Sequence, residues 1–307
     1  MAIPAYHELM LPLLRHAGDG AEHRLPLIAP LVARDAGLTP KDLAEVLASG
    51  QNRYRNRLAW AKVYLSRAGA LEPVQRGSFR ITERGKQLLA ASPAGITLDT
   101  LKQYPEFNTF LNKTAPEGEN KTTGFGEAGD KDDTPEETLE AAYASVRAAL
   151  GQQVLAAVMA ATPSFFENLV LDLMLAMGYG GSRVDAASNI AKSGDGGIDG
   201  IISEDRLGLD FIYLQAKRWT NSVGSDEVRN FSGSLDAHGA QKGVFITTST
   251  FTASALKYVR DVKHKKIVLI DGERLAALMM DFNVGVAPAK TFEVKRMDLE
   301  YFEEETA

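Results

Sequence analysis

Asp199, Gln215 and Lys217 place a carboxylate, an amide oxygen and an ammonium group within one short stretch of the chain. Gln215 and Lys217 are two residues apart, so on a β-strand their side chains project from the same face. A neighbouring strand that carried Asp199 would bring all three groups to one patch. These residue types favour metal-assisted phosphodiester hydrolysis as the chemistry of such a patch.

A magnesium ion suits this set of groups because it prefers oxygen ligands and keeps several of its waters. We expect Asp199 to anchor the metal, with Gln215 and the Ala216 carbonyl as further oxygen ligands. The metal lowers the pKa of bound water and neutralises charge that develops on the phosphate. Lys217 is expected to orient that water or to stabilise the developing charge.

The segments around these residues predict the strand pair. Two runs of β-type residues, 198–202 and 209–217, flank a polar stretch with Gly208 near its end, a pattern typical of a β-hairpin. The glycines before Ile198 do not predict a phosphate-binding loop, because such a loop is followed by a helix. Asp195, within that glycine-rich turn, is expected only to hydrogen-bond backbone.

A wider set of residues resembles a known family. Asp199 followed by Gln215-Ala216-Lys217 resembles the PD-(D/E)XK nuclease signature, with Gln where most members have Asp or Glu. The resemblance to the catalytic domain of Mrr-type restriction endonucleases, in which this Gln is characteristic, extends to the words GDGGIDG (194–200), QAKRW (215–219) and FITTS (245–249). It implies a catalytic role for the triplet and a Mg²⁺ cofactor for which Mn²⁺ can substitute.

Glu167 lies on a predicted helix over 164–177, which Pro163 begins. The resemblance implies that an acidic residue on this helix points into the active site, where it helps to position the metal or the water. The alternative role is local, because Ser164 and Glu167 have the spacing of a helix capping box. The sequence leaves both roles open.

The composition is that of a globular chain long enough for two domains. Its 307 residues are 45% hydrophobic and 24% charged, which are ordinary values. The absence of Cys excludes a disulfide framework and a thiolate metal site. No signal peptide and no apolar run of about 18 residues is visible, so we expect a cytoplasmic protein with no membrane contact.

Other catalytic motifs are missing from the sequence. The five His do not have the H-E-x-x-H spacing, and neither G-x-S-x-G nor G-x-x-x-x-G-K-[ST] occurs. A zinc protease, a serine hydrolase and an NTP-driven enzyme therefore lack their parts. No NTP is expected as a cofactor.

The net charge of −6 is unevenly distributed along the chain. Residues 1–92 contain 13 Lys and Arg against 8 Asp and Glu, a charge of +5, so the remainder carries −11. A basic N-terminal region beside an acidic remainder is compatible with nucleic-acid contact through the basic part.

Residues 1–92 predict a winged helix domain, and their order also resembles the N-terminal domain of Mrr-type enzymes. The predicted elements are helices over 5–17, 26–36, 40–49 and 52–68, a β-hairpin over 71–81 and a last helix from Thr82 to Leu89. The helix over 52–68 is the one with both an apolar stripe and many basic residues. It is the expected reader of DNA.

Such a helix can enter the major groove, where Arg and Asn read base edges and Lys contacts phosphate, while wing arginines touch the backbone. The predicted DNA-binding residues are Arg53, Arg55, Asn56, Arg57, Lys62, Arg76 and Arg80. The alternatives are a basic face that is only solvated, and a winged helix that binds protein. Arg218 and Trp219 are further candidates for DNA contact, with core packing as the alternative for Trp219.

Residues 93–136 predict one helix near 98–111 and then an acidic, flexible linker, because 113–135 has almost no aliphatic residues. The nuclease domain is predicted over 137–307. It begins with a long helix over 137–161 and ends with alternating strands and helices, an order that predicts parallel strands. The predicted class is α/β, or α+β for the whole chain: a winged helix domain followed by a PD-(D/E)XK restriction-endonuclease-like mixed sheet flanked by helices.

The family resemblance implies a type IV restriction endonuclease that binds double-stranded DNA and cuts modified, methylated foreign DNA. A cut through both strands needs two active sites, so we expect a homodimer or a higher homo-oligomer. Two alternatives stay open. One is a structure-specific endonuclease of the same fold that acts on DNA junctions or repair intermediates; the other is a non-catalytic winged helix DNA-binding regulator.

Overall fold

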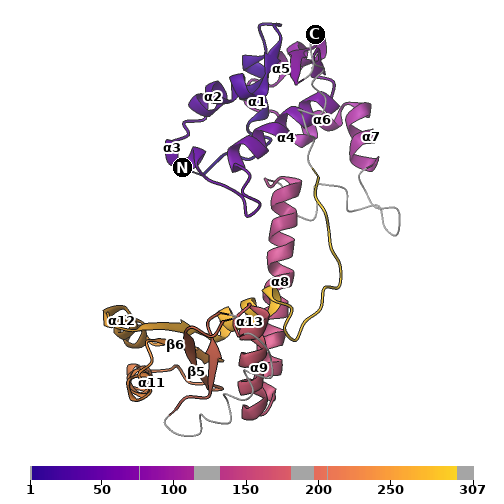
Figure 1. Cartoon of the computed structure of the whole chain (residues 1–307). Helices are drawn as coiled ribbons and strands as arrows, with labels where there is room; N and C mark the ends of the chain where they lie inside the picture. Colours follow the sequence, from indigo (N-terminus) through magenta and orange to yellow (C-terminus); the bar gives the residue numbers. More distant parts are fainter. Residues whose placement is uncertain (1, 76, 114–131, 181–196, 206, 296–307) are drawn as a thin grey trace, which may run out of the picture. The chain divides into compact units, whose positions relative to one another are not determined.

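The computed structural model describes residues 2–75, 77–113, 132–180, 197–205 and 207–295 (Figure 1). Arg76 and Asp195 lie outside the described residues. The chain divides into two compact units, Met1–Ser145 and Val146–Ala307, and each is described separately. No helix within the described residues is long and apolar enough to cross a membrane.

The first unit combines helices with a small antiparallel sheet. Its strands are β1 (His23–Arg24), β2 (Leu71–Pro73) and β3 (Ser78–Ile81), in the order β1-β3-β2. Its helices are α1 (Met10–His16), α2 (Leu25–Asp35), α3 (Pro40–Leu43), α4 (Arg53–Arg67), α5 (Glu83–Ala91), α6 (Leu98–Lys102) and α7 (Pro105–Lys113). Helix α4 followed by the β2–β3 hairpin, with the earlier strand β1 paired to β3, is the arrangement of a winged helix.

Helix α4 forms where the sequence supplies a cap and an apolar stripe. The Asn52 side chain accepts a hydrogen bond from the Arg55 N–H and so satisfies one of the free donors of the first turn. Leu58, Ala61 and Leu65 are buried on one face, as their spacing predicts. The helix ends before Gly69, which adopts a positive φ of +72°.

Residues 96–111 belong to the core of the first unit, whereas the sequence predicts them as a separate helix after the 1–92 domain. Ile96, Leu101 and Phe107 are buried among residues of α1 and α4. The predicted single helix is two short ones, α6 and α7. Helix α8 (Pro135–Ala160) follows, with residues up to Ser145 in the first unit and the rest in the second.

The second unit is built on a mixed four-stranded sheet in the order β4-β5-β6-β7. Strand β4 is antiparallel to β5, whereas β5, β6 and β7 are parallel, so the predicted mixed sheet is confirmed. The strands are β4 (Gly200–Ser203), β5 (Phe211–Lys217), β6 (Lys242–Thr247) and β7 (Lys266–Ile270). The helices are α9 (Pro163–Ala176), α11 (Ser225–Ala237), α12 (Ala253–Asp261) and α13 (Gly272–Asp281).

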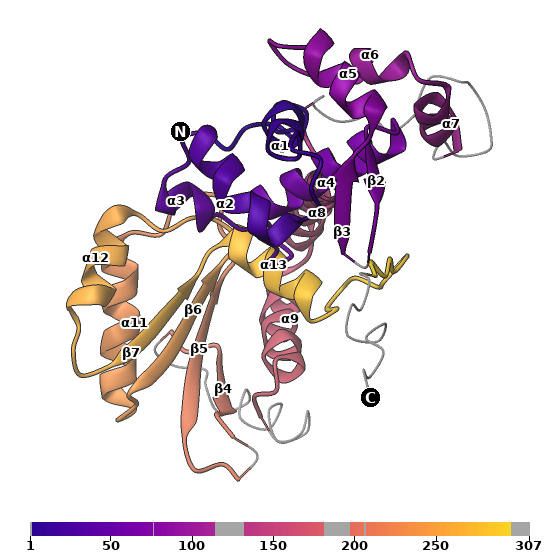
Figure 2. The ribbon, with the colours of Figure 1, turned by 90° about the horizontal axis from the view of Figure 1, so that it is seen from above.

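Each face of this sheet has its own core, with α11 and α12 on one side and α9 on the other (Figure 2). Ile212 and Leu214 of β5 pack in the α9 core, while Tyr213 packs against the core beneath α11 and α12. Because side chains alternate along a strand, Gln215 and Lys217 continue the face of Tyr213. The sheet therefore gives the two predicted site residues a common orientation at the end of β5.

Candidate active site

The register of the β4–β5 hairpin brings Asp199 to the end of β5. Gly200 pairs with Leu214, and the Asp199 N–H donates to the Leu214 carbonyl at 2.8 Å just before β4 begins. The Ala216 N–H in turn donates to Asp199 Oδ2 at 2.8 Å. The carboxylate is thus tied to the strand segment that carries Gln215 and Lys217.

Gln215 is buried, with 5% of its surface exposed, and its Oε1 has no hydrogen-bond partner among the described residues. A buried amide oxygen without a partner is costly and is uncommon in folded proteins. Its position opposite Asp199 suits this oxygen to bind a cation. The donor set, a carboxylate and neutral oxygens, matches what Mg²⁺ accepts.

Gly197 supports Gln215 from the turn before β4. It has a φ of +83°, and a Cβ at this position would lie 3.1 Å from Gln215 Nε2. A side chain here would therefore both strain the backbone and press on the amide. The sequence marks this residue only as one of several turn glycines, so its packing against Gln215 could not be predicted.

Glu167 projects from α9 close enough to interact electrostatically with the hairpin residues. Burial raises the pKa of its carboxyl, the Asp199 carboxylate raises the pKa further, and the Lys217 ammonium lowers it, with a net increase. The alternative that the sequence left open, a capping box of Ser164 and Glu167, is not the one the structure has. The N-cap of α9 is Thr162, whose side chain accepts from the Phe165 N–H, and Ser164 lies inside the helix.

The end of β5 is held by its neighbour β6. Thr247 Oγ1 donates to the Lys217 carbonyl at 2.8 Å, and the Lys217 ammonium lies 5.7 Å from the Trp219 ring centroid. Trp219 is 37% exposed and so is not a core residue. Arg218 donates to the Met159 carbonyl at the end of α8, which directs this side chain inward.

No group of three or more His, Cys, Asp or Glu poised for a metal occurs among the described residues. The candidate site instead has two carboxylates, from Asp199 and Glu167, together with the amide oxygen of Gln215. Ala216 is half-buried, and its N–H is the group that binds Asp199. Such a site is suited to an ion that retains part of its water shell.

The predicted DNA-binding residues of the first unit do not share one environment. Arg55 is exposed and has no side-chain hydrogen bond or ion pair to the residues the structure describes. Lys62 is half-buried with its ammonium 5.1 Å from the Phe79 ring centroid, and burial lowers its pKa. Arg80, on the wing, pairs with Glu72 at 2.6 Å.

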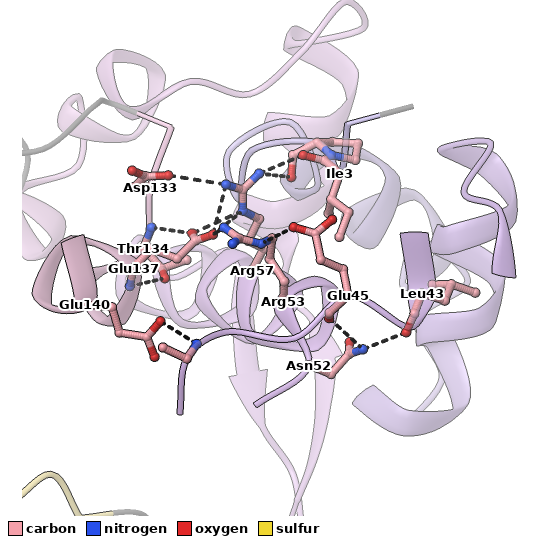
Figure 3. Close-up of polar contacts among 12 residues, drawn as sticks. Ile3, Leu43, Glu45, Asn52, Arg53, Arg57, Asp133, Thr134, Glu137 and Glu140 are labelled. Carbon is pink, nitrogen blue, oxygen red and sulfur yellow. Dashed lines mark hydrogen bonds and ion pairs between the residues drawn. The ribbon is translucent and has the colours of Figure 1, made fainter. Parts of the chain in front are cut away.

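Three other predicted DNA contacts on α4 are engaged internally, and Figure 3 shows two of them, Arg53 and Arg57. Arg53 and Arg57 both pair with Glu137. Asn56 is 1% exposed, and its Oδ1 accepts from the Thr134 hydroxyl at 2.6 Å. In this conformation the Asn56 amide cannot reach a base edge, so the prediction that it reads bases is corrected for the structure as it stands.

Comparison with known proteins supports the family resemblance that the sequence motifs indicate. A family model described as a restriction endonuclease matches residues 158–279, and one described as the Mrr N-terminal domain matches residues 6–91. The chain is 36% identical over 312 residues to the type IV methyl-directed restriction enzyme EcoKMrr of Escherichia coli (strain K12), covering 99% of this chain and 100% of that protein.

Two solved structures are more distantly similar. The DNA modification-dependent restriction endonuclease AspBHI is 18% identical with a TM-score of 0.34, covering 70% of this chain and 56% of that one. The MspJI restriction endonuclease in complex with a 27-mer oligonucleotide is 19% identical with a TM-score of 0.26, covering 66% and 47%. The chain spans about half the length of these two proteins, and scores this low give no basis for transferring geometry.

Proposed function

Because this chain belongs to the Mrr-type restriction endonucleases, we propose that it is a type IV enzyme that hydrolyses phosphodiester bonds in methylated DNA with Mg²⁺. Methylation as the target is supported by the relative that aligns over nearly the full chain, which is a methyl-directed restriction enzyme. A cytoplasmic location, where incoming DNA is met, is part of the same proposal.

The observation that carries the chemistry is the unpaired Gln215 Oε1 opposite Asp199. Asp199, Gln215 and the Ala216 carbonyl would hold the ion, which when bound supplies a water of lowered pKa and positive charge near the phosphate. Lys217 projects from the same strand face as Gln215, and in this proposal its ammonium orients the attacking water or stabilises the charge that develops on the phosphate.

Glu167 has a separate role in this proposal. Burial and the neighbouring Asp199 raise its pKa, which makes the carboxylate a better proton acceptor. A base of this kind takes the proton from the attacking water as the bond to phosphorus forms. Gly197 and Thr247 have positioning roles and transfer no protons. Gly197 leaves room for the Gln215 amide, and Thr247 fixes the Lys217 backbone by a hydrogen bond.

The direct test uses the purified variants Asp199→Ala and Lys217→Ala on methylated plasmid with and without Mg²⁺. We expect both to lose cleavage while retaining DNA binding. Asp210→Ala is the matched control, because Asp210 is a carboxylate of the same hairpin that pairs with Lys242 outside the site. Cleavage by either site variant at the wild-type rate would refute the assignment.

DNA contact by the first unit is proposed through Arg55, Lys62 and Arg80, which lie on α4 and the wing. A homodimer or higher assembly is proposed because a double-strand cut needs two sites.

A four-way junction supplied beside methylated duplex tests the substrate class. Preferred cleavage of the junction would indicate a repair endonuclease instead of a restriction enzyme. Binding without cleavage of any DNA would indicate a non-catalytic DNA-binding regulator.

A further inference from the structure

The start of α8 is a strongly acidic segment that lies against α4. Asp133, Glu136, Glu137 and Glu140 occur within eight residues, and each hydrogen-bonds or pairs with a residue of α4 or of the chain just before it. Figure 3 shows Asp133, Glu137 and Glu140. These contacts all lie within the first unit. They involve α4, the helix that we expect to read DNA.

Glu137 is the centre of this contact. Its side chain is 4% exposed and that of Arg57 is 11% exposed. Arg57 Nε donates to both Glu137 oxygens at 3.1 Å, and Arg53 donates to Glu137 as well. Although burial acts to raise the pKa of Glu137, hydrogen bonds from Arg57, Thr134 and Arg53 bring it below its ordinary value.

Further contacts extend the same docking on both sides. Asp133 pairs with Arg57 at 3.3 Å, and Thr134 donates to Asn56. Glu140 accepts from the backbone N–H groups of Ala48 and Ser49 at 2.8 and 2.9 Å, in the loop that precedes α4. The acidic segment therefore covers three of the α4 residues that the sequence predicts as DNA contacts.

We propose that the basic face of α4 is a shared anion site, which residues 133–137 occupy in this structure and which the phosphate backbone of DNA takes over when the protein binds. The inference rests on the proposed DNA binding by this domain. It assigns to the start of α8 the role of an internal competitor of DNA.

The chemistry of the two occupants is equivalent. The planar guanidinium binds carboxylate and phosphate oxygens with the same fork of donors. Arg53 and Arg57 also lie in the first turns of α4, where the helix dipole favours an anion. When only a fraction of the molecules has the site open, the apparent affinity for DNA falls by that fraction, so the competitor restrains binding at every sequence.

A purely structural role for Glu137 is the competing explanation. Glu137 accepts from the Thr134 N–H, and its own N–H donates to Thr134 Oγ1, which is the reciprocal pattern of a capping box. An anchor of this kind would stabilise the fold without regulating DNA affinity. Glu137→Gln separates the two roles, because Gln is accepted in a capping box but removes the charge that Arg53 and Arg57 bind.

The experiment measures binding of a fluorescent duplex, methylated or unmethylated, to full-length protein without divalent metal. For Glu137→Gln we expect affinity on the order of tenfold tighter for both duplexes, about 1.4 kcal/mol. The salt dependence should steepen by about 0.9 in log–log slope for each added phosphate contact. Glu106→Gln is the control, because it removes the same charge from an exposed pair with Arg84.

Equal affinities for the Glu137→Gln and Glu106→Gln variants would overturn the inference, and a lowered melting temperature with unchanged affinity would assign Glu137 to anchoring alone. Wild-type cleavage of methylated plasmid is measured in parallel. Its absence would count against the proposed nuclease function and leave the affinity comparison valid. An absence of DNA binding by every variant would overturn both.

A second variant tests the competitor by closing it. The natural chain has no Cys, so Asn56→Cys with Thr134→Cys introduces the only two thiols, at side chains that touch in this structure. Joining them by oxidation or with a short bifunctional thiol reagent should weaken DNA binding on the order of tenfold relative to the same protein unlinked. Equal binding by the linked and unlinked forms would overturn the proposal.

Discussion

Gln215 replaces a carboxylate of the common nuclease signature with a neutral amide, and its surroundings show how this substitution is accommodated. The side chain is buried with an Oε1 that is unpaired within the described parts of the chain, and Glu167 on α9 adds a second carboxylate to the charge of Asp199. Binding of a cation would relieve both the unpaired oxygen and the repulsion between the two carboxylates. The proposed metal site therefore draws its groups from three separate chain segments.

Gly197→Ala tests whether the turn before β4 positions the Gln215 amide. The added Cβ would lie 3.1 Å from Gln215 Nε2 at a φ of +83°, so we expect cleavage to fall and the Mg²⁺ concentration for half-maximal rate to rise. Gly239→Ala is the matched control, since Gly239 has a φ of +64° and no atom within 4 Å of its Cβ position. Equal losses of cleavage in the two variants would show that backbone strain alone causes the effect of Gly197→Ala.

Glu167→Gln tests the raised pKa through protein stability without metal. A carboxyl whose pKa is raised in the folded state favours folding below its ordinary value of 4.5, and that stability is lost as pH rises through the higher value. We therefore expect the Gln variant to melt at a higher temperature than wild type at neutral pH. The difference should vanish below pH 4.5, and a difference independent of pH would contradict the electrostatic cause.

At the scale of elements, the start of α9 shows what spacing alone cannot decide. Thr162 is the N-cap, although Ser164 and Glu167 have capping-box spacing. We expect Thr162→Ala to lower the free energy of unfolding of the second unit by about 1 kcal/mol, measured by chemical denaturation. Ser164→Ala should leave it nearly unchanged, and the reverse order would restore Ser164 as the cap.

The elements that position the site follow from local patterns. The runs at 198–202 and 209–217 predict the hairpin, and β6 is predicted by its apolar residues between 243 and 247. Once the two strands pair, the hydrophobic pattern and the turn fix their register. Asp199 then lies beside the end of β5. What depends on neighbours along the chain was therefore accessible from the sequence.

Contacts between distant segments were not accessible in this way. Asn56 and Arg57 have the residue types of a DNA-reading helix, and only their packing against Thr134 and Glu137 shows that they are occupied. Composition likewise assigned residues 96–111 outside the first domain, although Phe107 completes its core. Side-chain pairing across about 80 positions leaves no periodic signal in one sequence.

At the scale of the whole molecule, each chain has one set of Asp199, Gln215 and Lys217 and hence one proposed hydrolytic centre among the described residues. One such centre cleaves one strand at a time. Two chains acting together would cut both strands in a single encounter, whereas one chain would release a nicked intermediate. Product distribution thus reports how many chains act on one DNA molecule.

Mixing wild-type chains with an excess of Asp199→Ala chains tests this stoichiometry. If two chains assemble on DNA and exchange partners, hybrid assemblies hold one working centre, and we expect the plasmid product to shift from linear to nicked circles. Lys290→Ala chains, altered at an exposed residue outside the site, are the control and should leave linear product. Linear product undiminished by the inactive chains would show that one chain makes both cuts, because no defective partner then enters the reaction.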